Sequence, residues 1–135
     1  MRSKVALLAA AAGLGLSSSA SWGHHSFAAE FDIQRPVQLR GTITKVEFIN
    51  PHSWLHIDVT NEDGTVESWM IEGGTPNTLF RAGVNRNTLP LGAEVIVDGY
   101  QARDGSNKAS GRDVTFPDGR KLFLDGSAPP GEERR

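Results

Sequence analysis

The sequence predicts an all-β domain with one short helix, closed into a small barrel of five or six strands. Short runs rich in Val, Ile, Thr and aromatic residues alternate with turn sequences along the chain. A single helix start falls between the third and the fourth of these runs. No internal repeat interrupts this order, so one small domain is expected.

The first strand is expected over residues 37–48, a run rich in Val, Ile, Thr and Phe. Its apolar parity slips between Ile43 and Val46, with Gly41 nearby. A slip of this kind predicts a β-bulge in the strand.

The second strand follows the rigid Asn50-Pro51 turn, and its residues alternate between apolar and polar. Leu55, Ile57 and Val59 are predicted to face the core, because successive side chains of a strand leave opposite faces. The side chains expected to share the other face are Trp54, His56 and Asp58, together with His52 from the turn.

Asn61-Glu62-Asp63-Gly64 predicts a hairpin turn, after which residues 65–72 form the third strand with Trp69 and Ile71 on one face. Thr75 then caps a short helix over residues 76–82, because proline is favoured at the first helical position. Leu79 and Phe80 of this helix are expected to plug the core.

The last strands are expected over residues 93–101, 112–116 and 121–124, with Pro117-Asp118-Gly119 as the turn of the final hairpin. Three strands, a short helix and further strands in about 100 residues is the chain order of an OB-fold, a small barrel that its helix closes at one end. A β-sandwich or an open barrel is the alternative.

The chain begins with the pattern of a secretory signal peptide, in which Arg2 and Lys4 precede a short apolar run and then small residues. Cleavage is expected after Gly23, which makes residues 1–23 the signal, or after Ala20. The apolar run is too short to span a bilayer, and no later transmembrane segment is expected once the signal is removed.

The mature chain is therefore expected in the bacterial periplasm or outside the cell, where its lack of cysteine excludes disulfides. Loss of Arg2 and Lys4 leaves 12 basic and 16 acidic residues, a net charge of −4, and no basic stripe. Nucleic-acid binding is accordingly not expected. The expected parts are an arm over 24–36 pinned by Phe27 and Phe31, the barrel over 37–125 and a disordered tail over 126–135.

The sequence resembles a family of small exported bacterial proteins of uncharacterised function. The residues that carry this resemblance are His24-His25-Ser26-Phe27, Phe31-Asp32, Asn50-Pro51-His52, Trp69, Glu72, Pro76-Asn77, Leu79, Arg81 and Asp118-Gly119. The resemblance covers nearly all of the mature chain and implies an OB-like barrel in the periplasm, with no established activity.

The four histidines, His24, His25, His52 and His56, are candidate metal ligands, because imidazole is the commonest protein ligand for copper, zinc and nickel. In a regular strand the Cα atoms of His52 and His56 lie roughly 13 Å apart, too far for one ion. The expected site therefore joins the His24-His25 pair to His52, with His56 peripheral and Asp58 or Glu72 in support. Copper or zinc is the expected metal.

Cleavage after Gly23 would let the terminal amine and the imidazole of His24 chelate one Cu(II) as a brace, which raises the alternative of a copper oxidase or oxygenase. So small a barrel offers little substrate cleft, so the protein is expected not to be an enzyme. The histidines can also be purely structural, with His52 capping the turn and His56 paired with Trp54 or Asp58.

The functional expectation is a periplasmic ligand-binding domain that holds a divalent metal. The alternative is an adaptor that recognises a periplasmic protein or a glycan, without metal, through the OB face formed by Asn50, Trp54, Asp58 and Glu72.

Overall fold

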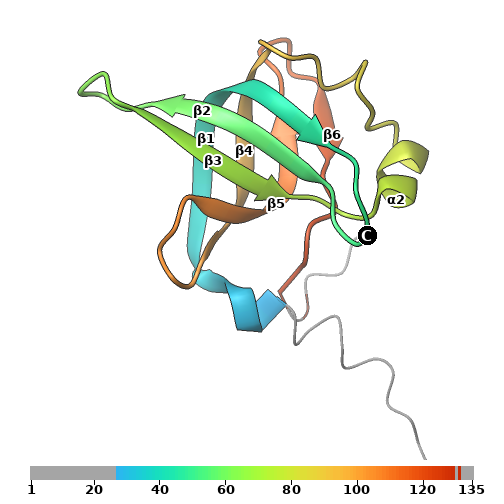
Figure 1. The fold of residues 1–135 in the computed structure, drawn as a ribbon, viewed down its shortest axis with the longest axis horizontal. Helices are drawn as coiled ribbons and strands as arrows, with labels where there is room; N and C mark the ends of the chain where they lie inside the picture. Colours follow the sequence, from blue (N-terminus) through green and yellow to red (C-terminus); the bar gives the residue numbers. More distant parts are fainter. Residues whose placement is uncertain (1–26, 130, 132–135) are drawn as a thin grey trace, which may run out of the picture.

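The computed structural model describes residues 27–129 and residue 131. A helical turn at residues 27–30 precedes the sheet strands (Figure 1). The elements that follow are β1 (Phe31–Glu47), β2 (Trp54–Thr60), β3 (Val66–Glu72), α2 (Pro76–Arg81), β4 (Glu94–Ala102), β5 (Lys108–Thr115) and β6 (Lys121–Phe123).

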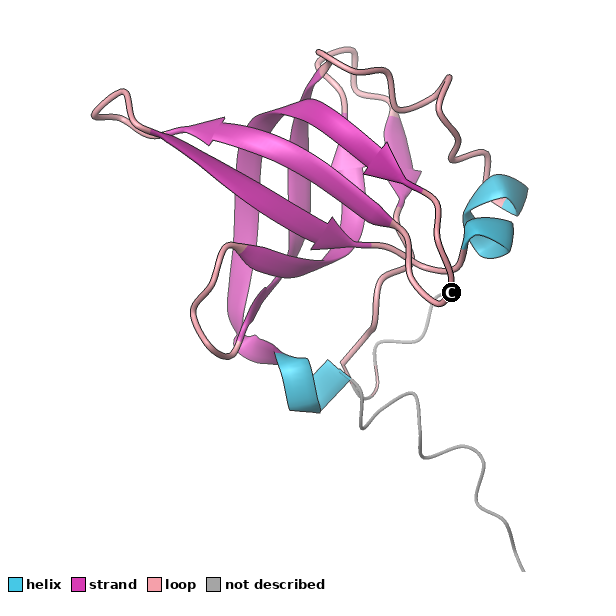
Figure 2. Ribbon diagram, viewed as in Figure 1, coloured by secondary structure: helices cyan, strands magenta, loops and turns pink. Residues whose placement is uncertain are grey.

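The strands form one sheet in the order β3-β2-β1-β4-β5-β6, in which all neighbours are antiparallel. A parallel pairing of β3 with β5 joins Met70–Glu72 to Lys108–Ser110 and curls the sheet into a ring (Figure 2). The chain enters α2 between β3 and β4. The predicted fold class, an all-β OB-like barrel with one short helix, is confirmed.

The core lies inside this ring, where the alternating residues of each strand meet. Leu55 and Ile57 of β2 and Trp69 and Ile71 of β3 are buried there, as predicted, and Val59 is half-buried against them. The pairing of β1 with β2 shifts register between Ile43 and Lys45, which confirms the predicted bulge.

The predicted hairpin turn and helix cap are both present. Asn61 N–H donates to Thr65 O at a distance of 2.8 Å. Gly64 has a φ of 85°, which glycine adopts without steric cost. Thr75 Oγ1 accepts from Thr78 N–H at 3.3 Å. Leu79 plugs the core, but Phe80 is 50% exposed and packs on the Phe48 ring instead, so only half of the predicted plug is correct.

Two strands begin earlier than the sequence pattern predicted. β1 starts at Phe31 rather than Val37, because Pro36 lies where β1 pairs with β4 but not yet with β2, and a missing N–H is tolerated on such an edge. β5 starts at Lys108 rather than Arg112, since the strands on both sides, β3 and β4, hold its Gly/Ser-rich first half.

The start of the predicted disordered tail is ordered, which corrects the expectation for residues 126–129. Gly126 N–H donates to Gly111 O at 3.0 Å. A Cβ at Gly126 would lie 2.7 Å from both Glu72 O and Gly111 O, so only glycine fits this approach. Residues 130 and 132–135 lie outside the described residues. In the described part of the chain no helix is long and apolar enough to cross a membrane.

Candidate functional site

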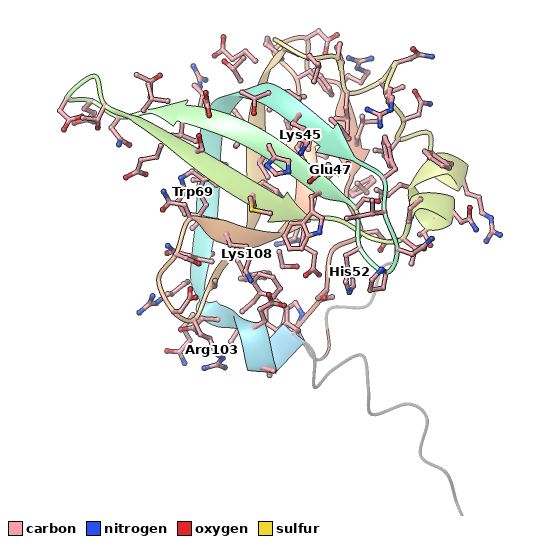
Figure 3. The ribbon with its side chains drawn as sticks, in the orientation of Figure 1. Lys45, Glu47, His52, Trp69, Arg103 and Lys108 are labelled. Carbon is pink, nitrogen blue, oxygen red and sulfur yellow. The ribbon has the colours of Figure 1, made fainter. Side chains whose placement is uncertain are left out.

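His52 lies on the connection between β1 and β2, directly after the cis Asn50–Pro51 peptide bond. Its side chain is 38% exposed, yet its Nδ1 atom is buried and has no hydrogen-bond partner among the described residues. Nδ1 lies 3.6 Å from Oε1 of Glu72, a distance longer than a hydrogen bond. Figure 3 shows His52 apart from Lys45 and Glu47.

Glu72 ends β3 with its side chain only 3% exposed. The strand pairing sets it between Trp54 of β2 and Ser110 of β5. Its Oε1 accepts two hydrogen bonds from Ser127, one from the hydroxyl at 2.6 Å and one from the backbone N–H at 3.2 Å. A buried carboxylate needs such donors, because an unpaired buried charge is costly.

His56 belongs to a second cluster, further along β2. Its Nε2 lies 2.8 Å from Oε2 of Glu47, whose other oxygen lies 2.7 Å from Lys45 Nζ. The hydrogen bond from Lys45, followed by that from His56, lowers the pKa of Glu47. The sequence predicted Trp54 or Asp58 as the partner of His56. Asp58 instead accepts from Ser68 Oγ at 2.7 Å.

The four residues predicted to form a ligand face, Asn50, Trp54, Asp58 and Glu72, do not all lie together: Asp58 is separate from the other three. Trp54 is half-buried on β2, with Glu47 on one neighbouring strand and Glu72 on the other. Asn50 is exposed on the turn that carries His52. Asp58 lies further along β2, across from Ser68, so it does not join the His52 end.

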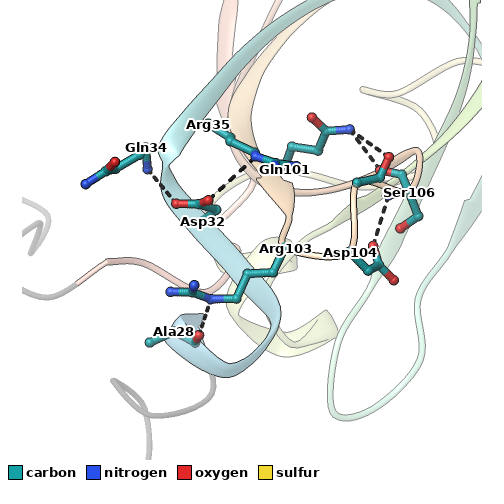
Figure 4. A network of polar contacts seen from close by, with 9 residues as sticks. Ala28, Asp32, Gln34, Arg35, Gln101, Arg103, Asp104 and Ser106 are labelled. Atoms are coloured by element: carbon teal, nitrogen blue, oxygen red, sulfur yellow. Dashed lines mark hydrogen bonds and ion pairs between the residues drawn. The ribbon is translucent and has the colours of Figure 1, made fainter.

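The arm that leads to the remaining two histidines is fixed to the barrel as predicted. Phe27 and Phe31 are buried in one cluster with Ala102, at the end of β4. Arg103 Nε donates to Ala28 O at 2.5 Å (Figure 4). The backbone N–H of Arg103 donates to Glu30 O at 2.9 Å. His24 and His25 themselves lie outside the described residues.

The described residues contain no group of three or more His, Cys, Asp or Glu side chains placed to hold one metal ion. They contain two separate imidazole–carboxylate pairs, His52 with Glu72 and His56 with Glu47. The two pairs present different atoms. His56 uses Nε2 toward its carboxylate, whereas His52 turns its buried Nδ1 toward Glu72.

Sequence reasoning missed two residues at these pairs, Glu47 and Ser127. Glu47 could have been found from the hairpin register, which places residues of β1 across from Trp54 and His56. Ser127 follows a run of Gly, Pro and charged residues typical of a disordered tail, and no local signal marks it.

A family model matches residues 12–111, a span that includes all four histidines and Glu72 but not Ser127. Its description is a family of unknown function (DUF6152). The search of curated proteins gave no significant match. The search of solved structures gave none either. Because the matched span covers well over half of the sequence, the chain belongs to this family of unknown function.

Proposed function

We propose that this protein is an exported ligand-binding domain that binds one divalent metal ion through His52 and the histidines of its N-terminal arm. The observation that carries the proposal is the orientation of His52. One ring nitrogen, Nδ1, is buried and lies 3.6 Å from a buried carboxylate, while the side chain as a whole is 38% exposed. Metal-binding histidines usually direct their second nitrogen to a carboxylate or a carbonyl in this way.

The exposure of the two residues supports the same reading. The His52 side chain is partly open to solvent, so an ion can reach its outer nitrogen, whereas Glu72 is enclosed and fixed by Ser127. His56, by contrast, has a ring nitrogen at hydrogen-bond distance from Glu47. The contact of His52 is longer, at 3.6 Å.

The remaining ligands must come from outside residues 27–129 and 131, because His52 and Glu72 are too few for a site. His24 and His25 supply them in this proposal. Phe27 is buried in one cluster with Phe31 and Ala102, so the chain that follows this pair is anchored to the barrel.

The ligand types favour a metal of intermediate softness. Three imidazoles without a thiolate suit Cu(II), Zn(II) or Ni(II) rather than Cu(I), which prefers sulfur. If the mature chain begins at His24, its terminal amine adds a fourth nitrogen and copper is favoured. If it begins at Ser21, the site is a clamp of side chains and zinc fits equally well.

A second candidate function is the recognition of a periplasmic protein or glycan through the surface near the β1–β2 connection. Its supporting observation is the exposure of apolar side chains there. Ile49 is 51% exposed beside the turn, and the half-exposed Phe80 lies against Phe48. Trp54 is half-buried on the outer face of β2. Aromatic groups of this kind are common in recognition surfaces.

Calorimetric titration of Zn(II) and of Cu(II) into the mature protein, after chelator treatment, distinguishes the metal-binding function from the recognition function. The proposal expects one ion per chain, a large loss of affinity in His52→Ala and little change in His56→Ala, which removes the same ring from the other pair. Equal affinities of wild type and His52→Ala would remove His52 from the site. No binding of either ion by the wild type would favour the recognition function, which Trp54→Ala would then test.

A further inference from the structure

We infer that Ser127 is a positioning residue that, through Glu72, selects the Nδ1–H tautomer of His52 and so leaves Nε2 as the nitrogen with a free lone pair. The consequence for metal affinity rests on the proposed function. The tautomer itself does not, because it is a property of the metal-free protein. Ser127 lies outside the span that the family model matches.

The segment that carries Ser127, residues 124–127, is hydrogen-bonded to β5 and to Gly74 after β3, and we term it the C-terminal strap. Leu124 N–H donates to Arg112 O, and Gly74 N–H donates to Leu124 O. Gly126 N–H donates to Gly111 O. The hydroxyl of Ser110 donates to the carbonyl of Ser127. Ser127 is therefore held by its backbone on both sides of its side chain.

The two donors of Ser127 and the ring of His52 converge on one oxygen atom. Oε1 of Glu72 accepts from the Ser127 hydroxyl and from its backbone N–H, and the same atom lies nearest to His52 Nδ1. Because the carboxylate is almost wholly buried, water offers it few alternative partners. The orientation of this oxygen is thus set by Ser127.

The tautomer follows from what each atom can donate or accept. An ionised carboxylate only accepts, whereas a neutral imidazole has one N–H and one lone pair. With a bare Nδ1, two lone pairs would face each other in a buried setting. With Nδ1–H, a small closure of the 3.6 Å distance yields a hydrogen bond. The N–H therefore belongs on Nδ1, and Nε2 keeps the lone pair that a metal ion requires.

His56 provides an internal reference, because its carboxylate faces the opposite ring nitrogen. Nε2 of His56 lies at hydrogen-bond distance from Glu47, so the same reasoning assigns the N–H to Nε2. The two described histidines of this chain should therefore be of opposite tautomer. Free imidazole side chains favour Nε2–H, so the state of His52 is the one that needs a structural cause.

The test is long-range ¹⁵N–¹H correlation spectroscopy of the imidazole rings in metal-free protein, recorded at a pH at which the ¹⁵N shifts themselves show both rings to be neutral. We expect Nδ1–H at His52 and Nε2–H at His56 in the wild type. Ser127→Ala should move His52 toward Nε2–H, and Ser127→Thr, which keeps the hydroxyl, should restore it. Ser68→Ala is the matched control, since Ser68 also donates to a carboxylate, that of Asp58.

A parallel zinc titration separates this inference from the proposed function. Ser127→Ala should weaken Zn(II) binding by up to roughly tenfold, less than the loss that is usual for the direct partner of a ligating histidine, because Ser127 acts through Glu72. A tautomer change without zinc binding by the wild type would overturn the metal function and leave the inference standing. Nε2–H at His52 in the wild type, or an unchanged tautomer in folded Ser127→Ala, would overturn the inference.

Discussion

Replacement of Gly126 by alanine should destabilise the whole barrel, although the sequence predicts a disordered tail at this position. The added Cβ would lie 2.7 Å from Glu72 O and from Gly111 O, and 2.8 Å from Ser110 Oγ. Ordinary contacts begin near 3.4 Å. The first two atoms are strand backbone atoms, Glu72 in the pairing of β3 with β5 and Gly111 in the pairing of β5 with β4, so they cannot yield without bending the sheet.

The chain has two ways to respond, and both cost free energy. If the strap stays in place, the overpacking costs about 1–3 kcal/mol. If the strap detaches, the hydrogen bond from Gly126 to Gly111 is lost and the Glu72 carboxylate loses both Ser127 donors, at about 1–3 kcal/mol for a buried group left unpaired. Either response lowers the free energy of unfolding by a similar amount.

Urea denaturation measures this loss, with the fluorescence of the buried Trp69 as one probe. For a domain of this size each kcal/mol lowers the melting temperature by about 4–8 °C. Ala128→Gly, at an exposed position directly after the strap, is the control and should change the free energy of unfolding by less than about 0.5 kcal/mol. Equal urea midpoints for Gly126→Ala and wild type would refute the close packing of the strap.

Three further predictions concern charge and packing. Burial raises the pKa of Asp113, so the native state holds this proton more tightly than the unfolded state, and the free energy of unfolding should fall as pH rises through the native pKa. Asp113→Asn should abolish that fall in urea midpoints measured across acidic pH, and an unaltered pH dependence would contradict the assignment to Asp113. The hydrogen bond from Lys45 lowers the pKa of Glu47, and the stability that this shift contributes is lost as pH falls through the native pKa of Glu47. Lys45→Met should raise this pKa in a carboxyl ¹³C titration, and an unchanged pKa would show that Lys45 and Glu47 do not form the ion pair. Ile57→Val should cost about 0.5–1.5 kcal/mol, because Ile57 is fully buried in the ring, and a neutral effect would mean that the core repacks.

The barrel could be predicted from the sequence because its strands have one buried face. Leu55 and Ile57 alternate with polar neighbours, and the turn at Asn61 and the cap at Thr75 depend on local chemistry. Strand ends were less predictable, since Lys108 and Pro36 become strand residues through their neighbours rather than through their own propensities.

The candidate site was predicted only in part, because its contacts join segments far apart in the chain. His52 and Glu72 could be chosen by residue type, but 19 positions separate them in the sequence, so their proximity could not be predicted. Ser127 is 55 positions from Glu72 and follows glycine in a polar tail. The pairing of His56 with Glu47 depends on the register of the β1–β2 hairpin, which the bulge shifts.

The most direct test of the central claim, that His52 and the terminal histidines bind a metal ion, is native mass spectrometry of untagged protein purified from the periplasm without chelator. One spectrum reports both the mature terminus and any bound ion. We expect one copper or zinc ion on a chain that begins at His24 or Ser21, and no ion on His52→Ala prepared in the same way. A metal-free wild type that stays metal-free after added copper and zinc, or a His52→Ala variant that retains the ion, would contradict it.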